Sequence, residues 1–299
     1  MPEAFPIIEV ASAMRSDVEQ LGSKPKFWFK HEGGNWLFKE ARDNTGEDWA
    51  EKVASEIAAA LGLPTHHTEL AVWEGKRGCA VKSFISSDWS VLVHGNELLG
   101  GLITGYDKEK ERGQSGHTFG NIVTVLERIF PSEKVLRVAA MRMAGYLVLD
   151  ALVGNTDRHH QNWGVLLERK EQAGQQAVFL LQLAPTFDHA SSLGRELTDE
   201  ARERHLHDGT IERYIWKGRG GIFEDAHSKH GMSPVALAQM LARRYPEFFK
   251  PWQTRVRDLP ETFCAELLRR VPDGRISESG RGFALALLSA SRKMLKESP

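Results

Sequence analysis

The chain has 299 residues, of which 41% are apolar and 26% are charged, and this balance is typical of a soluble globular protein with a substantial core. Its formal net charge of −1 gives no overall electrostatic case for nucleic acid or an anionic membrane as a partner. The two cysteines, Cys79 and Cys264, stand outside any metal-ligand spacing, and the chain has neither a signal-like N-terminus nor a long apolar run, so we expect a protein of the reducing cytoplasm.

Two short aromatic runs near the N-terminus predict a β-hairpin. Residues 26–30 (KFWFK) and 36–40 (WLFKE) carry apolar side chains near a period of two, and the stretch HEGGN separates them. We expect Gly33 and Gly34 at the tip of this hairpin. The glycine pair has two interpretations: it permits the positive φ of a turn, or it lets backbone N–H groups approach the phosphates of a nucleotide.

A helix is expected over residues 49–61, because its apolar residues recur every four positions on one face. Lys39 lies on the second strand of the hairpin, and Glu51 and Glu56 both lie on the helix. If the helix packs against the hairpin, one of these glutamates can form an ion pair with Lys39 and hold its ammonium group ready for phosphate oxygens. The alternative is that both glutamates are solvated on an exposed face.

The rest of the chain divides into a β-rich beginning and a helical remainder. A second hairpin is expected around the turn at residues 75–78, and residues 85–118 have the glycine-rich, polar composition of long connections with one short helix. We therefore expect a small, mainly β lobe over residues 1–86 and a mainly helical lobe over residues 87–299. The expected helices cover residues 119–130, 133–151, 233–245, 261–271 and 281–296.

The polar run GNTDRHHQN, residues 154–162, follows a buried helix and precedes an apolar strand. Asp157 and Asn162 lie in this run, and Asp188 follows after an apolar hairpin. Oxygen ligands of this kind suit a magnesium-bound phosphate better than a soft metal. Phosphoryl transfer needs magnesium, a positioned lysine and a carboxylate near the attacking hydroxyl. We interpret Asp157 as the carboxylate that orients the hydroxyl, and Asn162 and Asp188 as ligands of the metal.

The stretches TDRHHQNWGVL and TFDHASSLG resemble the catalytic and metal loops of the HipA-like serine/threonine kinases. The DRH-x-x-N pattern is also similar to that of the phosphoinositide kinases. The resemblance spans the catalytic elements from Lys39 to Asp188. It implies an α+β, bilobal protein-kinase-like fold with a small, mainly β N-lobe and a larger, mainly helical C-lobe, and it implies ATP and Mg²⁺ as cofactors.

The resemblance also implies a role for each candidate residue. Glu51 is preferred to Glu56 as the partner of the lysine, because the family's helix carries its glutamate ten residues before a Leu-Gly pair, here Leu61 and Gly62. His159 lies within the family pattern and acts either at the phosphate or in bracing the loop. The implied roles are catalytic for Asp157 and His159, metal-binding for Asn162 and Asp188, and nucleotide-binding for Lys39, Glu51, Gly33 and Gly34.

Two features depart from the family pattern. Full-length HipA-like toxins carry an additional N-terminal subdomain, whereas few residues precede the first expected strand here. The chain therefore resembles the shorter, core-only members, some of which work with a separately encoded small partner such as an antitoxin. The family's glycine-rich loop often carries an autophosphorylated serine, but HEGGN has none, which leaves Ser23 and Ser115 as the serines to examine.

The implied function is an ATP- and magnesium-dependent kinase that phosphorylates serine or threonine of a protein, with a translation factor such as an aminoacyl-tRNA synthetase as the family's precedent. A lipid or small-molecule kinase is the alternative, although the missing basic cluster argues against a lipid. A non-catalytic kinase-like binding module is a third interpretation, and the complete set of active-site residues argues against it. The basic stretches 202–204 and 217–219 either bind an acidic substrate or form a solvated face.

Overall fold

The computed structural model describes residues 3–18, 25–85, 90–170 and 177–296, and its N-terminal part is a six-stranded sheet. Its strands are β1 (Ile7–Val10), β2 (Arg15–Val18), β3 (Lys26–His31), β4 (Gly34–Glu40), β5 (Thr68–Trp73) and β6 (Lys76–Lys82). The order is β1-β5-β6-β4-β3-β2, with β1 parallel to β5 and the other neighbours antiparallel. Both expected hairpins are present, and the short strands β1 and β2, which the sequence did not predict, form the two edges.

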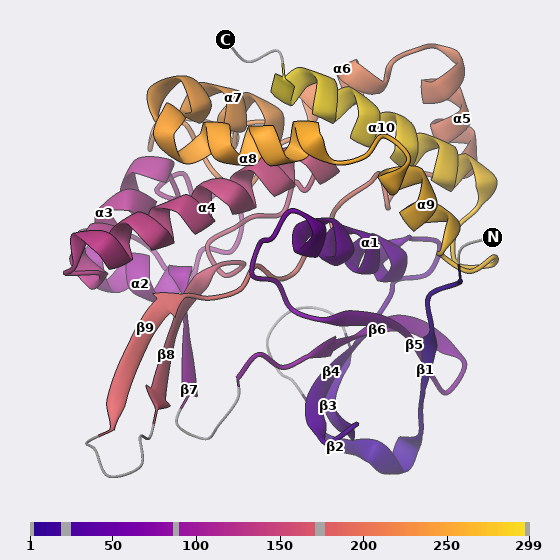
Figure 1. Ribbon diagram of the computed structural model, residues 1–299, viewed down its shortest axis with the longest axis horizontal. Coiled ribbons are helices and arrows are strands. Elements are labelled where there is room, and N and C mark those ends of the chain that lie inside the picture. The colour runs from indigo at the N-terminus through magenta and orange to yellow at the C-terminus, as the bar shows by residue number, and fades with distance from the viewer. Residues whose placement is uncertain (1–2, 19–24, 86–89, 171–176, 297–299) are drawn as a thin grey trace.

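Helix α1 (Glu47–Ala60) lies between this sheet and the helical part of the chain, as Figure 1 shows. It begins at Glu47 rather than at the expected Trp49. The reason is that Glu47 and Asp48 belong to its first turn, where carboxylates are stabilised by the positive end of the helix dipole. Because both sides of the helix are covered, it buries charged positions such as Glu51 and Lys52 together with its apolar stripe.

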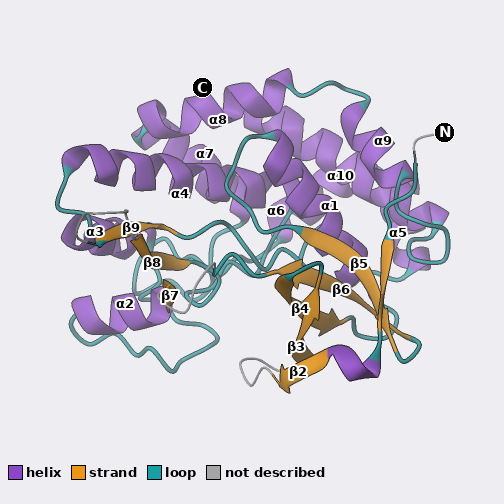
Figure 2. Cartoon of the chain, turned by 60° about the horizontal axis from the view of Figure 1, so that its bottom comes forward, coloured by secondary structure: helices purple, strands orange, loops and turns teal. Residues whose placement is uncertain are grey.

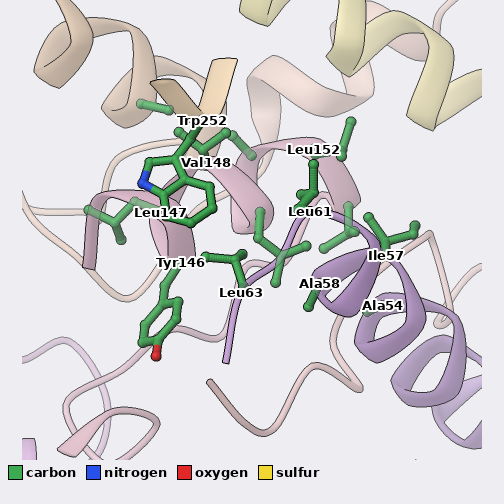
Figure 3. Close-up of a cluster of buried hydrophobic side chains, with 14 of the residues drawn as sticks. Ala54, Ile57, Ala58, Leu61, Leu63, Tyr146, Leu147, Val148, Leu152 and Trp252 are labelled. Atoms are coloured by element: carbon green, nitrogen blue, oxygen red, sulfur yellow. The ribbon is translucent and has the colours of Figure 1, made fainter. Parts of the chain in front are cut away.

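One hydrophobic core joins α1 to the helical part. Figure 3 shows Leu61 and Leu63, which directly follow α1, beside Leu152 of helix α4 (Glu133–Val153) and Trp252 of helix α8 (Pro246–Asp258), respectively. All four side chains are buried. Because burying a large apolar side chain contributes roughly 1.5–3 kcal/mol, this contact holds the N-terminal sheet and the helices in one fixed arrangement.

The C-terminal part is mainly helical and includes a small second sheet. Its helices besides α4 and α8 are α2 (Gly95–Leu102), α3 (Phe119–Ile129), α5 (Asp199–His207), α6 (Ile211–Lys217), α7 (Pro234–Arg244), α9 (Phe263–Arg269) and α10 (Glu278–Lys296). The second sheet has the order β7 (Ser90–His94), β8 (Gly164–Lys170) and β9 (Val178–Leu183). In the view of Figure 2 most helices gather on one side and the strands of both sheets on the other.

The expected α+β arrangement, a β-rich N-terminal sheet followed by a helical C-terminal part, is confirmed. The five helices expected with bounds in the C-terminal part are present, whereas α5, α6 and α8 were not predicted. The expected boundary after Ser86 lies outside the described residues. Within the described ranges, every helix is too short or too polar to cross a bilayer.

Helix α4 carries the chain into the polar run that follows it. From Met143 to Val153 every residue of this helix is buried, including Asp150. Gly154 ends the helix with φ of 68°, a left-handed conformation that glycine adopts without a steric penalty. The polar run therefore starts from the fully buried C-terminal half of this helix.

An ion pair between buried groups ties the N-terminal sheet to the C-terminal part. Asp48 of α1 accepts from Arg275 at 2.7 Å and from Arg77 of β6 at 3.1 Å. Arg275 precedes α10, and its second Nη donates to the carbonyl of Ala71 in β5. Because Asp48 and Arg275 are both almost fully buried, each depends on the other to offset the loss of its hydration.

A buried histidine anchors the long connection between α2 and α3. His117 donates from Nδ1 to the carbonyl of Gly221 at 2.7 Å and accepts at Nε2 from the indole N–H of Trp163 at 3.0 Å. Burial is the main cause that lowers the pKa of His117 to about 3, and nearby His160 lowers it further. The neutral ring therefore joins this connection to the polar run and to the segment around Gly221.

Replacing Asp48 with Ala should lower the free energy of unfolding by about 3 kcal/mol, because the buried Arg275 then loses its counter-charge. Urea denaturation of the purified protein measures this change. Asp273→Ala is the matched control: Asp273 pairs with Arg281 but is fully exposed, so its removal should leave the free energy of unfolding almost unchanged. Equal losses in the two variants would contradict the role given to Asp48.

The pH dependence of stability tests the neutral state of His117. An unfolded histidine titrates near about 6.5. Between pH 6.5 and the folded pKa of about 3, the unfolded chain binds a proton that the folded chain does not, so stability falls as the pH drops through this window. The contribution at pH 5 is about 2 kcal/mol. His117→Gln should therefore lose less stability between pH 7 and pH 5 than the wild type, and an equal loss by urea denaturation would refute the assignment.

Candidate active site

A pocket of about 580 Å³ opens between the N-terminal sheet and the loops of the C-terminal part. Lys39 of β4 and the beginning of α1 form one wall. The polar run, from Thr156 to Gln161, and Asp188 form the opposite wall. The connection around Gln114 closes a third side. Residues far apart in the sequence thus meet in one polar cleft.

Lys39 lies between two carboxylates. Its Nζ is 3.1 Å from Oδ1 of Asp188 and 4.0 Å from Oε2 of Glu51. Burial alone would lower the pKa of Lys39, but the carboxylates of Asp188 and Glu51 raise it by more, so its net pKa lies above the usual value. The lysine therefore stays charged at neutral pH, and a hydrogen-bonded carboxylate holds its ammonium group in the pocket.

Glu51 is fully buried behind Lys39. Its Oε1 accepts a hydrogen bond from the backbone N–H of His189 at 2.9 Å, and Nε2 of His66 lies 2.9 Å from the same oxygen. Burial raises the pKa of Glu51, but Lys39 and His66 lower it by more, so the carboxyl group stays ionised. The other helical glutamate, Glu56, pairs instead with Lys52 at 2.7 Å. The structure therefore brings Glu51, and not Glu56, to the lysine.

A buried arginine frames the polar run. Arg158 donates from Nε and Nη2 to the two carboxylate oxygens of Asp150, both at 2.8 Å. Its Nη1 donates to the carbonyls of Asn162 and Phe187. Asn155 also donates to Asp150, and its own Oδ1 accepts from the backbone N–H of Asp157 at 3.0 Å. One guanidinium group thus links α4, the polar run and the segment before Asp188.

Asp157 points into the pocket with its side chain accessible to solvent. The hydroxyl of Ser191 donates to its Oδ2 at 3.4 Å, and Arg195 donates to Ser191 Oγ at 3.0 Å. Partial burial raises the pKa of Asp157; His159 lowers it, and the nearby Asp188 raises it, with a net rise. A carboxylate with a raised pKa is a better proton acceptor, so this position suits a general base.

His159 and Asn162 brace the polar run from two sides. His159 lines the pocket, and its Nδ1 accepts from the backbone N–H of Gln161 at 3.2 Å. Asn162 is buried, and its amide donates to the backbone carbonyl of Asp157 at 2.7 Å, which leaves Oδ1 as its acceptor. Asn162 thus adjoins the pocket through Asp157 but does not belong to the residues that line it.

The oxygen atoms near the pocket fit a hard cation that keeps most of its ligands from phosphate and water. Among the described residues, no three His, Cys, Asp or Glu side chains converge as a protein-only metal cage requires. Mg²⁺ commonly takes one or two protein oxygens beside phosphate and water. Asp188, with its side chain 42% exposed in the pocket, and Oδ1 of Asn162 are oxygens of that kind.

The structure does not bring Gly33 and Gly34 to the pocket. In the β3–β4 hairpin Lys39 pairs with Lys26, whereas Gly34 pairs with His31 at the other end, roughly 17 Å away at about 3.3 Å per residue. Gly33 has φ of +70°, as a tight turn requires, so of its two interpretations the structure supports the turn. The connection from β2 to β3, residues 19–24, includes Ser23 and lies outside the described residues.

Several residues of the site escaped the sequence analysis. Arg158 lies inside the DRH-x-x-N pattern, but the pattern alone assigns it no role. The signal that could have found it is Asp150 in the buried helix before it, because a buried carboxylate needs a cationic partner. Arg195 and Glu47 bridge the two walls of the pocket by an ion pair, and no local pattern connects them. Ser115, the second serine to examine, does not line the pocket.

Comparison with known proteins identifies the relatives of this chain. The HipA-like C-terminal domain family matches residues 19–245. Serine/threonine-protein kinase CtkA of Helicobacter pylori is 28% identical over 158 residues, which is 53% of this chain and 44% of CtkA. The chain therefore aligns in sequence with less than half of that relative.

Solved structures extend the comparison. The crystal structure of CtkA has a TM-score of 0.71 at 20% identity and covers 96% of this chain and 95% of the CtkA chain. HipA of Shewanella oneidensis MR-1, solved with HipB and operator DNA, has a TM-score of 0.59 at 12% identity and covers 96% of this chain and 66% of HipA. These likenesses confirm the protein-kinase-like fold. Because the family match spans well over half of the sequence, the chain belongs to the HipA-like C-terminal domain family.

Proposed function

We propose that the protein is an ATP- and magnesium-dependent kinase that phosphorylates serine or threonine of a protein substrate. The observation that carries this proposal is the meeting of Lys39, Asp157 and Asp188 in one pocket, with Glu51 buried behind the lysine. These side chains come from a strand, a helix and two separate loops. A positioned ammonium group, a proton acceptor and a metal-binding carboxylate are the parts that phosphoryl transfer uses.

The residues divide the reaction between them. Lys39 binds phosphate oxygens of the nucleotide, and Glu51 keeps the ammonium group in place. Asp157 orients the serine or threonine hydroxyl and accepts its proton as the hydroxyl oxygen bonds to the γ-phosphorus and the bond to the β–γ bridging oxygen breaks. Asp188 and Asn162 would hold Mg²⁺, which when bound neutralises charge on the phosphates.

A separately encoded regulator is part of the proposal. HipA of Shewanella oneidensis was solved with HipB, and this chain covers 66% of that HipA. By analogy we propose that a small partner protein of the HipB kind restrains this kinase in its cell, as an antitoxin restrains a toxin. A translation factor is the class of protein substrate to examine first. The competing possibilities are that the phosphate acceptor is a lipid or a small molecule, or that the protein transfers no phosphate.

Asp157→Asn should reduce transfer of the γ-phosphate by at least about a hundredfold, because a neutral amide cannot accept the hydroxyl proton. Asp188→Asn should cause a loss of similar size through weaker metal binding. The measurement is incubation with magnesium and labelled ATP, alone and with cell lysate, followed by separation of proteins, lipids and small molecules. Asp208→Asn, an exposed carboxylate on the surface after α5, is the control that should keep full activity.

The location of the label separates the interpretations. Label in a lysate protein that disappears in both variants supports the protein kinase. Label only in the lipid or small-molecule fraction would replace it with the alternative kinase. Nucleotide binding by the wild type without any transfer would make the protein a binding module.

Glu51→Gln tests the positioning of Lys39 with a change of charge alone. Without the carboxylate the ammonium group loses one of its two partners, so kcat/KM for ATP should fall roughly tenfold or more. Glu56→Gln on the same helix is the matched control, because Glu56 pairs with Lys52 away from the pocket, and it should stay within about twofold of wild type. Equal effects of the two substitutions on kcat/KM would contradict the proposal that Glu51 positions Lys39.

A further inference from the structure

A second, smaller pocket adjoins the active site. This side pocket, of about 270 Å³, lies between α6, α4, α7 and α10, and it shares Thr156 and Ser191 with the walls of the active-site pocket. Thr156 directly precedes Asp157, and Ser191 donates to the Asp157 carboxylate. The side pocket is therefore next to the active-site pocket, on the side where Asp157 would meet an acceptor hydroxyl.

A glycine-containing segment forms the wall between the two pockets. Gly218 and Arg219 line the side pocket, and Gly220 and Gly221 line the active-site pocket. At Gly221 the segment packs against the polar run with no space for a side chain, because a Cβ there would lie 2.7 Å from the backbone of Arg158. This contact fixes the backbone of the segment against the polar run, close to the two cations Lys217 and Arg219.

The two cations that line the side pocket have no partner among the described residues. Lys217 and Arg219 are exposed at the rim of the side pocket, and within the described part of the chain neither side chain donates a hydrogen bond or forms an ion pair. The acidic residue among the described lining residues is Glu196, whose Oε1 accepts from the hydroxyl of Tyr214 at 2.6 Å. The floor of the pocket is apolar and consists of Ala151, Ile215, Pro234, Val235 and Leu287.

An apolar floor below two free cations matches a side chain with a short methylene stem and a carboxylate at its end. We propose that the side pocket binds an aspartate or glutamate that flanks the phosphorylated serine or threonine of the protein substrate. This inference rests on the proposed kinase function. Because Thr156, the neighbour of Asp157 in the chain, lines the side pocket, we expect the acidic residue within a few positions of the acceptor, at about 3.4 Å per residue of an extended peptide.

Competing explanations fit these observations less well. If Lys217 and Arg219 were only solvated surface residues, the pocket beside them, which shares two lining residues with the active-site pocket, would have no explanation. The other basic stretch of the sequence contributes nothing here, because Arg202 is buried and paired with Asp199 at 2.8 Å and Arg204 does not line the side pocket. Within the described structure, the side pocket thus adds unpaired positive charge beside Asp157 to that of exposed Arg112 in the active-site pocket, and it is the site that combines such charge with buried apolar lining residues.

A peptide library tests the proposal on the full chain. Each peptide holds one serine, with Asp or Glu, Lys or Arg, or Ala at each of the three positions on either side, and phosphorylation is measured with labelled ATP and magnesium. We expect the wild type to prefer an acidic over a basic residue by roughly fivefold in kcat/KM at one or more positions, because two exposed ion pairs are formed or lost. The preference should shrink at high salt.

Charge reversal assigns the preference to the side pocket. The double variant Lys217→Glu/Arg219→Glu should reverse the preference toward basic residues, and Lys217→Ala/Arg219→Ala should abolish it without reversal. Arg213→Glu is the matched control, because Arg213 is exposed on the same helix α6 but does not line the pocket, and it should keep the wild-type preference. Circular dichroism confirms that each variant is folded.

The outcomes separate this inference from the function on which it rests. A wild type that phosphorylates peptides without acidic preference, or a charge-reversed variant that keeps it, overturns the side-pocket proposal and leaves the kinase intact. If only a folded lysate protein is phosphorylated, the charge-reversed variant must act on it at least about fivefold more slowly than Arg213→Glu, and equal rates overturn the proposal. A wild type that phosphorylates nothing overturns both.

Discussion

The buried contact between Arg158 and Asp150 is the interaction on which the site depends. Asp150 belongs to the packed end of α4 and is buried, so its carboxylate needs a counter-charge, which the bidentate guanidinium group of Arg158 supplies. The same guanidinium group donates to the carbonyls of Asn162 and Phe187. A residue that must be satisfied for the core to form therefore also sets the distance between the two loops that carry Asp157 and Asp188.

The opposite wall of the pocket is held by a second set of buried charges. Asp48 and Arg275 tie α1 to the C-terminal part, and α1 presents Glu51 to Lys39. Helix α1 also shares one hydrophobic core with α4. The same core therefore fixes the position of the lysine relative to the polar run. The geometry of the pocket thus follows from two helices, α1 and α4. Their buried carboxylates, Asp48, Glu51 and Asp150, each bind a charged side chain of a neighbouring segment and hold that segment in place.

Much of this arrangement could be predicted from the sequence, and the limits have physical causes. Strong periodicity predicted the hairpins, α1 and the long helix, and family resemblance placed Glu51 ahead of Glu56. The short edge strands β1 and β2 carry too few residues for a periodic signal. Helix α8 contains Pro251 in its interior, which argues against a helix locally, yet its buried face, with Phe249 and Trp252 among others, outweighs that preference.

The glycine pair shows a different limit. A local pattern identified a turn with glycines next to an aromatic strand, and the turn exists, but only the pairing of β3 with β4 reveals that it points away from Lys39. Similarly, the link between Arg195 and Glu47 joins residues that are remote in sequence. Contacts of this kind depend on tertiary packing, which a single sequence does not display.

The charge of the pocket bears on why a divalent cation belongs to the proposed reaction. The described lining residues include six carboxylates, Glu40, Glu47, Asp48, Glu111, Asp157 and Asp188, against five cations, Lys26, Lys39, Arg42, Arg112 and Arg195. With neutral histidines the lining has a formal charge of −1, so it cannot by itself balance a triphosphate that carries several negative charges. A nucleotide would have to bring positive charge with it, and Asp188, next to Lys39, offers the carboxylate that such a cation needs. Glu51 then remains as the counter-charge of the lysine. This division of roles explains why two carboxylates lie around one ammonium group.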